Sequence, residues 1–196
     1  MDIGLDHHIA DVCKVIEDNQ LSEVVLVGHS YGALVISGVA KKLANKIHSL
    51  LYLDAPIPED NTSLLDILGP DQAQIFYNSA KIGDGWRVDS FPAAAFGLIN
   101  KADIAWALPQ HTAQSLKCFT DKVAVLTSDE APHLKIGYIQ CTPGNAFTDA
   151  QFKLAREKGW CQYQIEAPHS PMITHPEQFI ELLCNQIIPE MSPGDY

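Results

Sequence analysis

The chain has 196 residues, of which 46% are hydrophobic and 19% charged, so a disordered protein is excluded and one folded domain is expected. Its 24 acidic residues outnumber 13 lysines and arginines, and the formal net charge of −11 argues against nucleic acid as a partner. No apolar run reaches the roughly 18 residues of a membrane-spanning helix, and the first residues do not resemble a secretory signal, so we expect no membrane partner and a cytoplasmic location.

The first part of the chain alternates helical and strand patterns. Apolar residues recur at helical spacing and predict a helix over 7–19, with Asp6 as its N-cap. The run "EVVLV" at 23–27 has the β-branched character of a strand buried on both faces. After a second helical pattern, "SLLYL" at 49–53 indicates another buried strand, which ends at Asp54.

The middle of the chain has a looser pattern. Residues 61–122 combine helical pieces and aromatic side chains with scattered prolines and glycines, which indicates an inserted helical lid. The flanking segments, 1–60 and 123–196, would then form the core of the domain.

The last part returns to alternation. "KIGYIQC" at 135–141 predicts a strand, and a capping box at 148–151 predicts the start of a helix that Gly159 closes. A last strand at 161–167 and a helix beginning at Pro176 follow. Strands that alternate with helices predict an α/β fold, with a mostly parallel sheet covered by helices.

The stretch "LVGHSYGALV" contains a G-x-S-x-G pattern between a predicted strand and a predicted helix. In that context a sharp turn exposes the serine hydroxyl, so Ser30 is a candidate nucleophile. Gly28 and Gly32 are expected to be small in order to avoid collisions, and the Tyr31 N–H to bind an oxyanion. We expect His29 to be structural. The alternative is a tight strand-to-helix turn without chemistry.

A nucleophilic serine needs a histidine to accept its proton. His169 is the best candidate, because it follows the last predicted strand, where an open parallel sheet presents its catalytic groups. Its alternative is an exposed loop histidine. The remaining histidines lie on or beside helices, in the loose middle segment or at a helix cap: His7, His8, His48, His111, His133 and His175.

The segments "VVLVGHSYGALVISGVA", "LLYLDAPIPEDNTSLLD", "YIQCT" and "HSPMITHPEQ" together resemble the α/β-hydrolase superfamily. The similarity is to its compact esterases, related to plant methylesterases and hydroxynitrile lyases, and to their bacterial relatives. The resemblance implies a catalytic triad in the order serine, acid, histidine, onto which Ser30 and His169 map directly.

The acid of that triad is open. Many members place it in a pattern like C-T-x-D, whereas this chain has "CTPG" at 141–144. Asp54 is our choice, since it closes the strand at 49–53 at the same sheet edge, although a loop or N-cap role fits it equally well. Asp149 is the alternative, but the first turn of a helix stabilises a carboxylate there without catalysis.

The resemblance also implies a longer N-terminal part of the fold. The complete fold has about four strands before the nucleophile strand, and a His-Gly loop among them supplies a second oxyanion donor. Here 22 residues precede the strand at 23–27, so we expect the N-terminal strands to be missing, in a truncated product or a shortened hydrolase. That strand would then be an apolar edge, which predicts self-association.

Metal and organic cofactors find no support in the sequence. The five cysteines are scattered with no C-x-x-C spacing, no His, Cys or carboxylate cluster has ligand spacing, and no G-x-G-x-x-G occurs. We therefore expect a chemistry that needs only water.

The favoured function is a serine hydrolase that cleaves small carboxylic esters or lactones through an acyl-enzyme. Loss of one oxyanion donor costs about 10² to 10³ in rate, so the activity is expected to be weak. The alternative is a catalytically impaired truncated hydrolase or a ligand-binding module. Hydroxynitrile cleavage is a further, less favoured reaction, because it needs a cation placed at the site.

Overall fold

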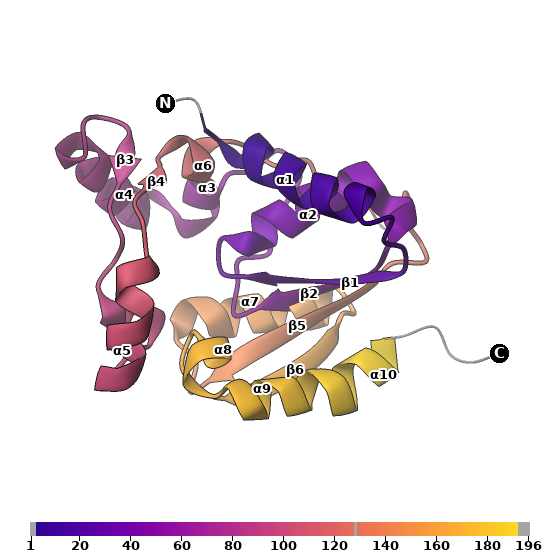
Figure 1. Cartoon of the computed structure of the whole chain (residues 1–196). Coiled ribbons are helices and arrows are strands. Elements are labelled where there is room, and N and C mark those ends of the chain that lie inside the picture. The colour runs from indigo at the N-terminus through magenta and orange to yellow at the C-terminus, as the bar shows by residue number, and fades with distance from the viewer. Residues whose placement is uncertain (1–2, 128, 192–196) are drawn as a thin grey trace.

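The protein is built around a parallel sheet of four strands, as the computed structural model of residues 3–127 and 129–191 shows (Figure 1). In spatial order the strands are β1 (Val24–His29), β2 (Ile47–Leu53), β5 (Lys135–Thr142) and β6 (Cys161–Glu166). On the central strand, Leu51 lies opposite Val27 of β1 and Gly137 of β5. The expected α/β fold with a parallel sheet is confirmed, and each predicted strand lies within two residues of its observed bounds.

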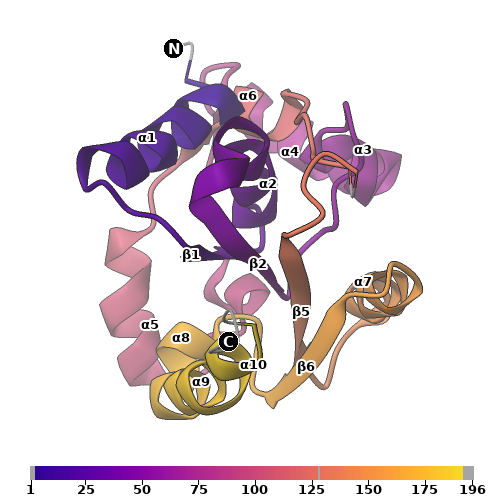
Figure 2. The same cartoon turned by 90° about the vertical axis from the view of Figure 1, so that its right-hand side faces the viewer.

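Helices cover both faces of the sheet (Figure 2). One face carries α1 (Leu5–Asp18), α2 (Gly32–Leu43) and α7 (Ala146–Glu157); the other carries α9 (Pro176–Leu182), a π-helical turn (Leu183–Ile187) and α10 (Ile188–Met191). Two short elements connect strands and helices: a 3-10 turn (Ala44–Lys46) and α8 (Pro171–Thr174). Among the described residues, every helix is too short or too polar to cross a membrane.

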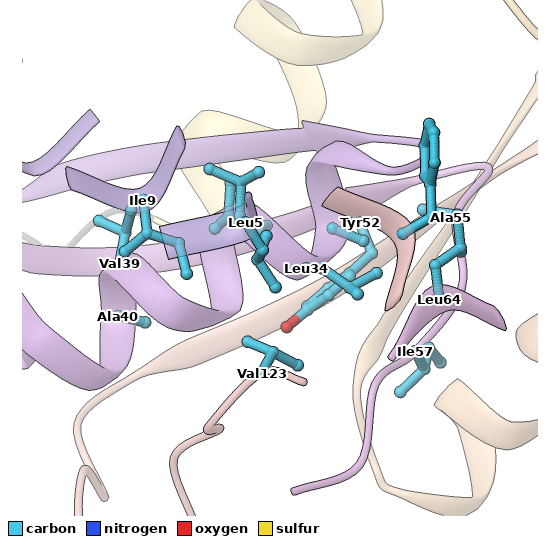
Figure 3. Packing of buried hydrophobic residues seen from close by; sticks show 14 of the residues in the cluster. Leu5, Ile9, Leu34, Val39, Ala40, Tyr52, Ala55, Ile57, Leu64 and Val123 are labelled. Carbon is cyan, nitrogen blue, oxygen red and sulfur yellow. The ribbon is translucent and has the colours of Figure 1, made fainter. Parts of the chain in front are cut away.

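Each face of the sheet has its own apolar core. Leu5 and Ile9 of α1 belong to one cluster with Leu34 and Val39 of α2 and Tyr52 of β2 (Figure 3). Alternate strand residues point to the other face, where Leu51, Leu53 and Ile139 join one cluster with Ile187 and Met191 of the C-terminal helical segment. Because β2 is buried on both faces, it fixes the position of the residue that follows it.

The segment 61–122 forms a helical excursion between β2 and β5. It contains α3 (Leu64–Leu68), α4 (Pro70–Ile82), β3 (Arg87–Val88), a 3-10 turn (Ala93–Phe96), α5 (Lys101–Ala107), a 3-10 turn (Leu108–Gln110), β4 (Gln114–Ser115) and α6 (Lys117–Thr120). Its two ends are joined, since the Val123 N–H donates to the Thr62 carbonyl at 3.0 Å. The chain therefore leaves and re-enters the core at one place, while the role of this segment as a lid stays a prediction.

Two predicted helix starts are wrong, that of α1 by two residues and that of α7 by three. Gly4, and not Asp6, is the N-cap of α1, and Asp6 lies within the first turn. The N-cap of α7 is Asn145, whose side chain accepts from the Thr148 N–H, while the Asn145 N–H donates to Thr148 Oγ1 at 3.0 Å. Asparagine caps a helix at least as well as threonine does, so the reciprocal pair forms three residues earlier than predicted.

Strand β1 lies at the edge of the sheet. Within the described residues it pairs with β2 alone, and its outer backbone groups face no other strand. Val27 near its end is 38% exposed. The apolar edge expected from the sequence is therefore present in this part of the chain, and self-association through it stays a prediction.

Candidate active site

Three candidate residues follow the carboxyl ends of neighbouring strands. Ser30 comes directly after β1, Asp54 directly after β2, and His169 lies in the loop between β6 and α8. In a parallel sheet these ends share one edge, where ligands of open α/β folds bind. The Ser30 N–H donates to the carbonyl of Leu53 at 3.2 Å, which places the serine beside the end of β2.

Ser30 occupies a strained turn. Its φ is +52°, in the left-handed region that residues with a side chain rarely adopt. The turn is closed by the Ala33 N–H, which donates to the Ser30 carbonyl at 3.0 Å. Such a conformation between a strand and a helix is the geometry in which a serine hydroxyl is presented at the sheet edge.

The two glycines of the G-x-S-x-G pattern differ in how much space surrounds them. A Cβ on Gly28 would lie 2.8 Å from the Gly32 carbonyl oxygen and 2.8 Å from Ile36 Cδ1, so Gly28 must be small, as expected. A Cβ on Gly32 would meet no atom of the described residues within 4 Å. The expectation that crowding requires Gly32 is therefore wrong, because the first turn of α2 faces open space at this point.

Tyr31 is the N-cap of α2. The backbone N–H groups at the N-terminus of a helix have no acceptor within the helix. The Tyr31 side chain is tied down, because the hydroxyl is 2.9 Å from His8 Nδ1 and the ring packs edge-on against Phe119. Burial raises the pKa of the Tyr31 phenol well above its usual value. The ring thus anchors the turn while its main-chain N–H stays at the helix N-terminus, a position that favours an anion.

His169 and Asp54 form a direct pair. His169 Nδ1 donates to Asp54 Oδ2 at 2.7 Å, and the Asp54 side chain is only 6% exposed. The other carboxylate oxygen accepts from the Cys141 N–H at 3.1 Å, and the Asp54 N–H donates to the Ile139 carbonyl. With its Nδ1 proton held by a buried carboxylate, the ring presents Nε2 as its basic nitrogen.

Asp149 is engaged elsewhere. Its Oδ1 accepts from Gln140 Nε2 at 2.6 Å, and Gln140 Oε1 in turn accepts from Gln164 Nε2. The carboxylate lies in the first turn of α7, as the sequence indicates. Of the two candidate acids, Asp54 is therefore the one that contacts His169.

The candidate nucleophile Ser30 and the candidate base His169 are not paired in the described part of the chain. Among residues 3–127 and 129–191, no hydrogen bond joins Ser30 Oγ to His169. Catalytic hydrogen bonds are often long before substrate binds and shorten only in the reacting complex, so this geometry is compatible with catalysis without requiring it.

Sequence reasoning missed two contacts with the His169 loop. The His29 ring donates from Nε2 to the His169 carbonyl at 2.7 Å. Gly97, at φ +72°, lies so close that a Cβ there would collide with Pro168 and come within 3.0 Å of the His169 nitrogen. A lone glycine in the middle segment was the only signal for the second contact, and no local pattern pairs positions 29 and 169.

A cavity of about 740 Å³ lies away from these residues. It covers the sheet face next to α2 and includes the stacked rings of Tyr52 and Trp160. None of Ser30, Asp54 and His169 lines it. The cavity therefore does not belong to the edge of the sheet at which the candidate site lies.

Comparisons with known proteins agree with this architecture. The model of the alpha/beta hydrolase family matches residues 2–182. An extracellular alpha/beta-hydrolase from a Paenibacillus species, described as sharing homology with tobacco salicylic acid binding protein 2, has a TM-score of 0.77 at 17% identity, over 94% of this chain and 80% of its own. Tomato methylketone synthase I bound to 2-tridecanone has a TM-score of 0.74 at 20% identity, over 94% and 78%.

One curated relative is similar in sequence. The carbendazim hydrolyzing esterase of Nocardioides sp. (strain SG-4G) is 53% identical over 66 residues, which are 34% of this chain and 27% of that enzyme. The match thus spans about a quarter of the relative's length. The family model, which matches most of the chain, confirms the superfamily resemblance noted in the sequence: the chain belongs to the alpha/beta hydrolase family.

Proposed function

We propose that the protein is a serine hydrolase that cleaves small carboxylic esters or lactones with Ser30 as nucleophile, His169 as base and Asp54 as acid. The observation that carries this proposal is the 2.7 Å bond between His169 Nδ1 and a buried Asp54, next to a serine in a left-handed turn. The family match and the esterase relative support hydrolysis as the reaction class.

The proposed reaction has two halves. Ser30 Oγ attacks the substrate carbonyl carbon while His169 Nε2 takes the hydroxyl proton, and Asp54 stabilises the imidazolium that results. The Tyr31 N–H donates to the oxyanion of the tetrahedral intermediate. The proton then passes from Nε2 to the leaving alkoxide, and the ester bond breaks to give an acyl-enzyme.

Water completes the cycle. His169 Nε2 removes a proton from a water molecule as its oxygen attacks the acyl carbon, and the second tetrahedral intermediate forms at the same Tyr31 N–H. Collapse of this intermediate returns the proton to Ser30 Oγ and releases the carboxylic acid. No group beyond these side chains, the Tyr31 main-chain N–H and water takes part.

The second candidate function is an impaired hydrolase or a ligand-binding module of this fold. The observation that favours it is the lack of a hydrogen bond between Ser30 and His169 among the described residues. A serine whose hydroxyl is not activated would leave the fold intact and hold a ligand without cleaving it.

A fluorophosphonate probe followed by peptide mass spectrometry separates the two. If the protein is a serine hydrolase, we expect an adduct on Ser30 that is absent in Ser30→Ala and in His169→Ala. Asp54→Asn should slow labelling by about 10³-fold or more, because the imidazolium loses its partner. Asp149→Asn is the matched control and should label like the unaltered protein.

The outcomes are distinct. A folded sample that stays unlabelled would favour the ligand-binding module. Slower labelling in Asp149→Asn than in Asp54→Asn would show that the acid has been assigned to the wrong residue.

A further inference from the structure

We propose that His29 is a positioning residue for the base, holding the main chain of His169 against the strand that carries Ser30. This inference rests on the proposed function and adds to it, because it gives the residue before the nucleophile a task of its own. It concerns no contact with substrate, so His29 is not a catalytic residue.

The contact is specific in its atoms. His29 Nε2 is 2.7 Å from the carbonyl oxygen of His169, and a carbonyl can only accept, so Nε2 carries the proton. The two imidazole rings are 4.5 Å apart between centroids and tilted by 46°, so the His29 ring also packs against the ring it positions. The same residue thus contacts both the backbone and the side chain of the base.

The charge state of His29 suits this task. Burial, together with the neighbouring charge of His169, lowers the pKa of His29 to about 4. At neutral pH the ring is therefore uncharged, and its one N–H is the donor used in this bond. A neutral ring adds no positive charge beside the imidazolium that His169 becomes during the reaction.

The position of the contact in the fold explains its effect. His169 lies in a loop, and its side chain reaches Asp54 at the end of β2. Its carbonyl is bonded to the last residue of β1, which is joined covalently to Ser30. The base is thereby tied to both strands that carry the other two members of the proposed triad.

Loosening one of these ties should reduce the rate. A misplacement of about 1 Å between reacting groups lowers rates on the order of 100-fold. If the His169 loop is free to shift, Nε2 spends less time within reach of Ser30 Oγ. Substrate binding, which does not involve His29, should change little.

Three variants of His29 distinguish the effect of its N–H donor from the effect of its ring. His29→Gln places an amide N–H near the position of Nε2 and keeps the donor; His29→Asn is one methylene shorter and loses it; His29→Phe keeps a ring without a donor. His48→Phe is the matched control, because His48 Nε2 also donates to a main-chain carbonyl, that of Met191, at the opposite end of β2.

We expect kcat to depend on whether residue 29 has an N–H donor. For an ester substrate, His29→Phe and His29→Asn should lower kcat by about 10-fold to 100-fold with KM within about twofold, and slow fluorophosphonate labelling of Ser30 equally. His29→Gln should restore most of kcat. His48→Phe should keep its kcat even where it lowers the melting temperature.

A readout independent of turnover completes the test. The His169 Nδ1 proton that bonds to Asp54 is observed as a far-downfield line in proton NMR. We expect this line to be sharp in the unaltered protein and in His29→Gln, and broadened or lost in His29→Asn and His29→Phe. The Gln and Asn pair also serves if the Phe variant does not fold.

Failure of this inference and failure of the proposed function give different results. Unchanged kcat and an unchanged downfield line in His29→Asn would reduce His29 to a packing residue, while labelling of Ser30 would leave the proposed function standing. Failure of the unaltered protein to label would remove the proposed function instead, and the NMR comparison would still decide whether His29 fixes His169.

Discussion

Acid should destabilise this protein through His29 in an amount that can be worked out. Burial and the charge of His169 lower the pKa of His29 in the folded protein to about 4, whereas an exposed histidine titrates near 6.5. As the pH falls below about 6.5, the unfolded chain therefore binds a proton that the folded protein does not. Unfolding is favoured by this proton, so stability is lost as the pH falls toward 4.

The size of the loss follows from the two pKa values. The free energy of unfolding should drop by about 2 kcal/mol at pH 5 and by about 3 kcal/mol at pH 4, relative to pH 7. His29→Gln keeps a donor for the His169 carbonyl but has no titrating group. It should lack this part of the pH dependence while it retains the part due to the carboxylates.

Urea denaturation followed by tryptophan fluorescence at pH 7, 6, 5 and 4 measures the difference. Between pH 7 and pH 4, the free energy of unfolding of His29→Gln should rise relative to that of the unaltered protein by about 3 kcal/mol. Parallel stability curves for the two proteins would refute the reasoning, because they would mean that His29 titrates alike in the folded and unfolded states.

Four further substitutions test the contacts around the candidate site and at the edge of the sheet. Gly28→Ala should lower the free energy of unfolding by about 1–3 kcal/mol through collision with the main chain and Ile36, while Gly32→Ala, with open space around its methyl, should be neutral or slightly stabilising in thermal melts. Tyr138→Phe should cost about 2 kcal/mol in denaturant titrations, since the hydroxyl serves both the carbonyl and the N–H of Ala55. We also propose that the edge strand β1 pairs with a second copy, so Val27→Lys should shift the protein toward the monomer in light scattering; a monodisperse monomer before substitution would contradict this.

The strands were the most readable part of the sequence. Runs such as "EVVLV" and "SLLYL" are mostly apolar without alternation, because both faces of a parallel sheet are buried. Ser30, Asp54 and His169 could be placed at one edge for the same reason, since parallel strands bring their carboxyl ends together. The order of elements therefore sufficed to bring candidate residues from three segments to the same edge.

Caps and close contacts were less readable. Several residues compete for an N-cap within one turn, and the choice of Asn145 over Thr148 depends on a reciprocal bond that either residue type can make. The bond from His29 to His169 joins positions 140 residues apart and involves a main-chain carbonyl, which no side-chain pattern specifies. The crowding at Gly28 and the open space at Gly32 likewise depend on neighbours from the folded chain.

Backbone conformation sets a limit on how this chain can change. Ser30 and Asp54 have φ values of +52° and +45°, and each left-handed residue with a side chain costs about 1–2 kcal/mol that neighbouring contacts must offset. Glycine or asparagine would relieve the turn at position 30 but would remove the hydroxyl. In a related protein that has lost catalytic activity, we therefore expect Ser30 to be replaced early by glycine or asparagine. A serine kept at this position would then indicate that the related protein still uses the hydroxyl.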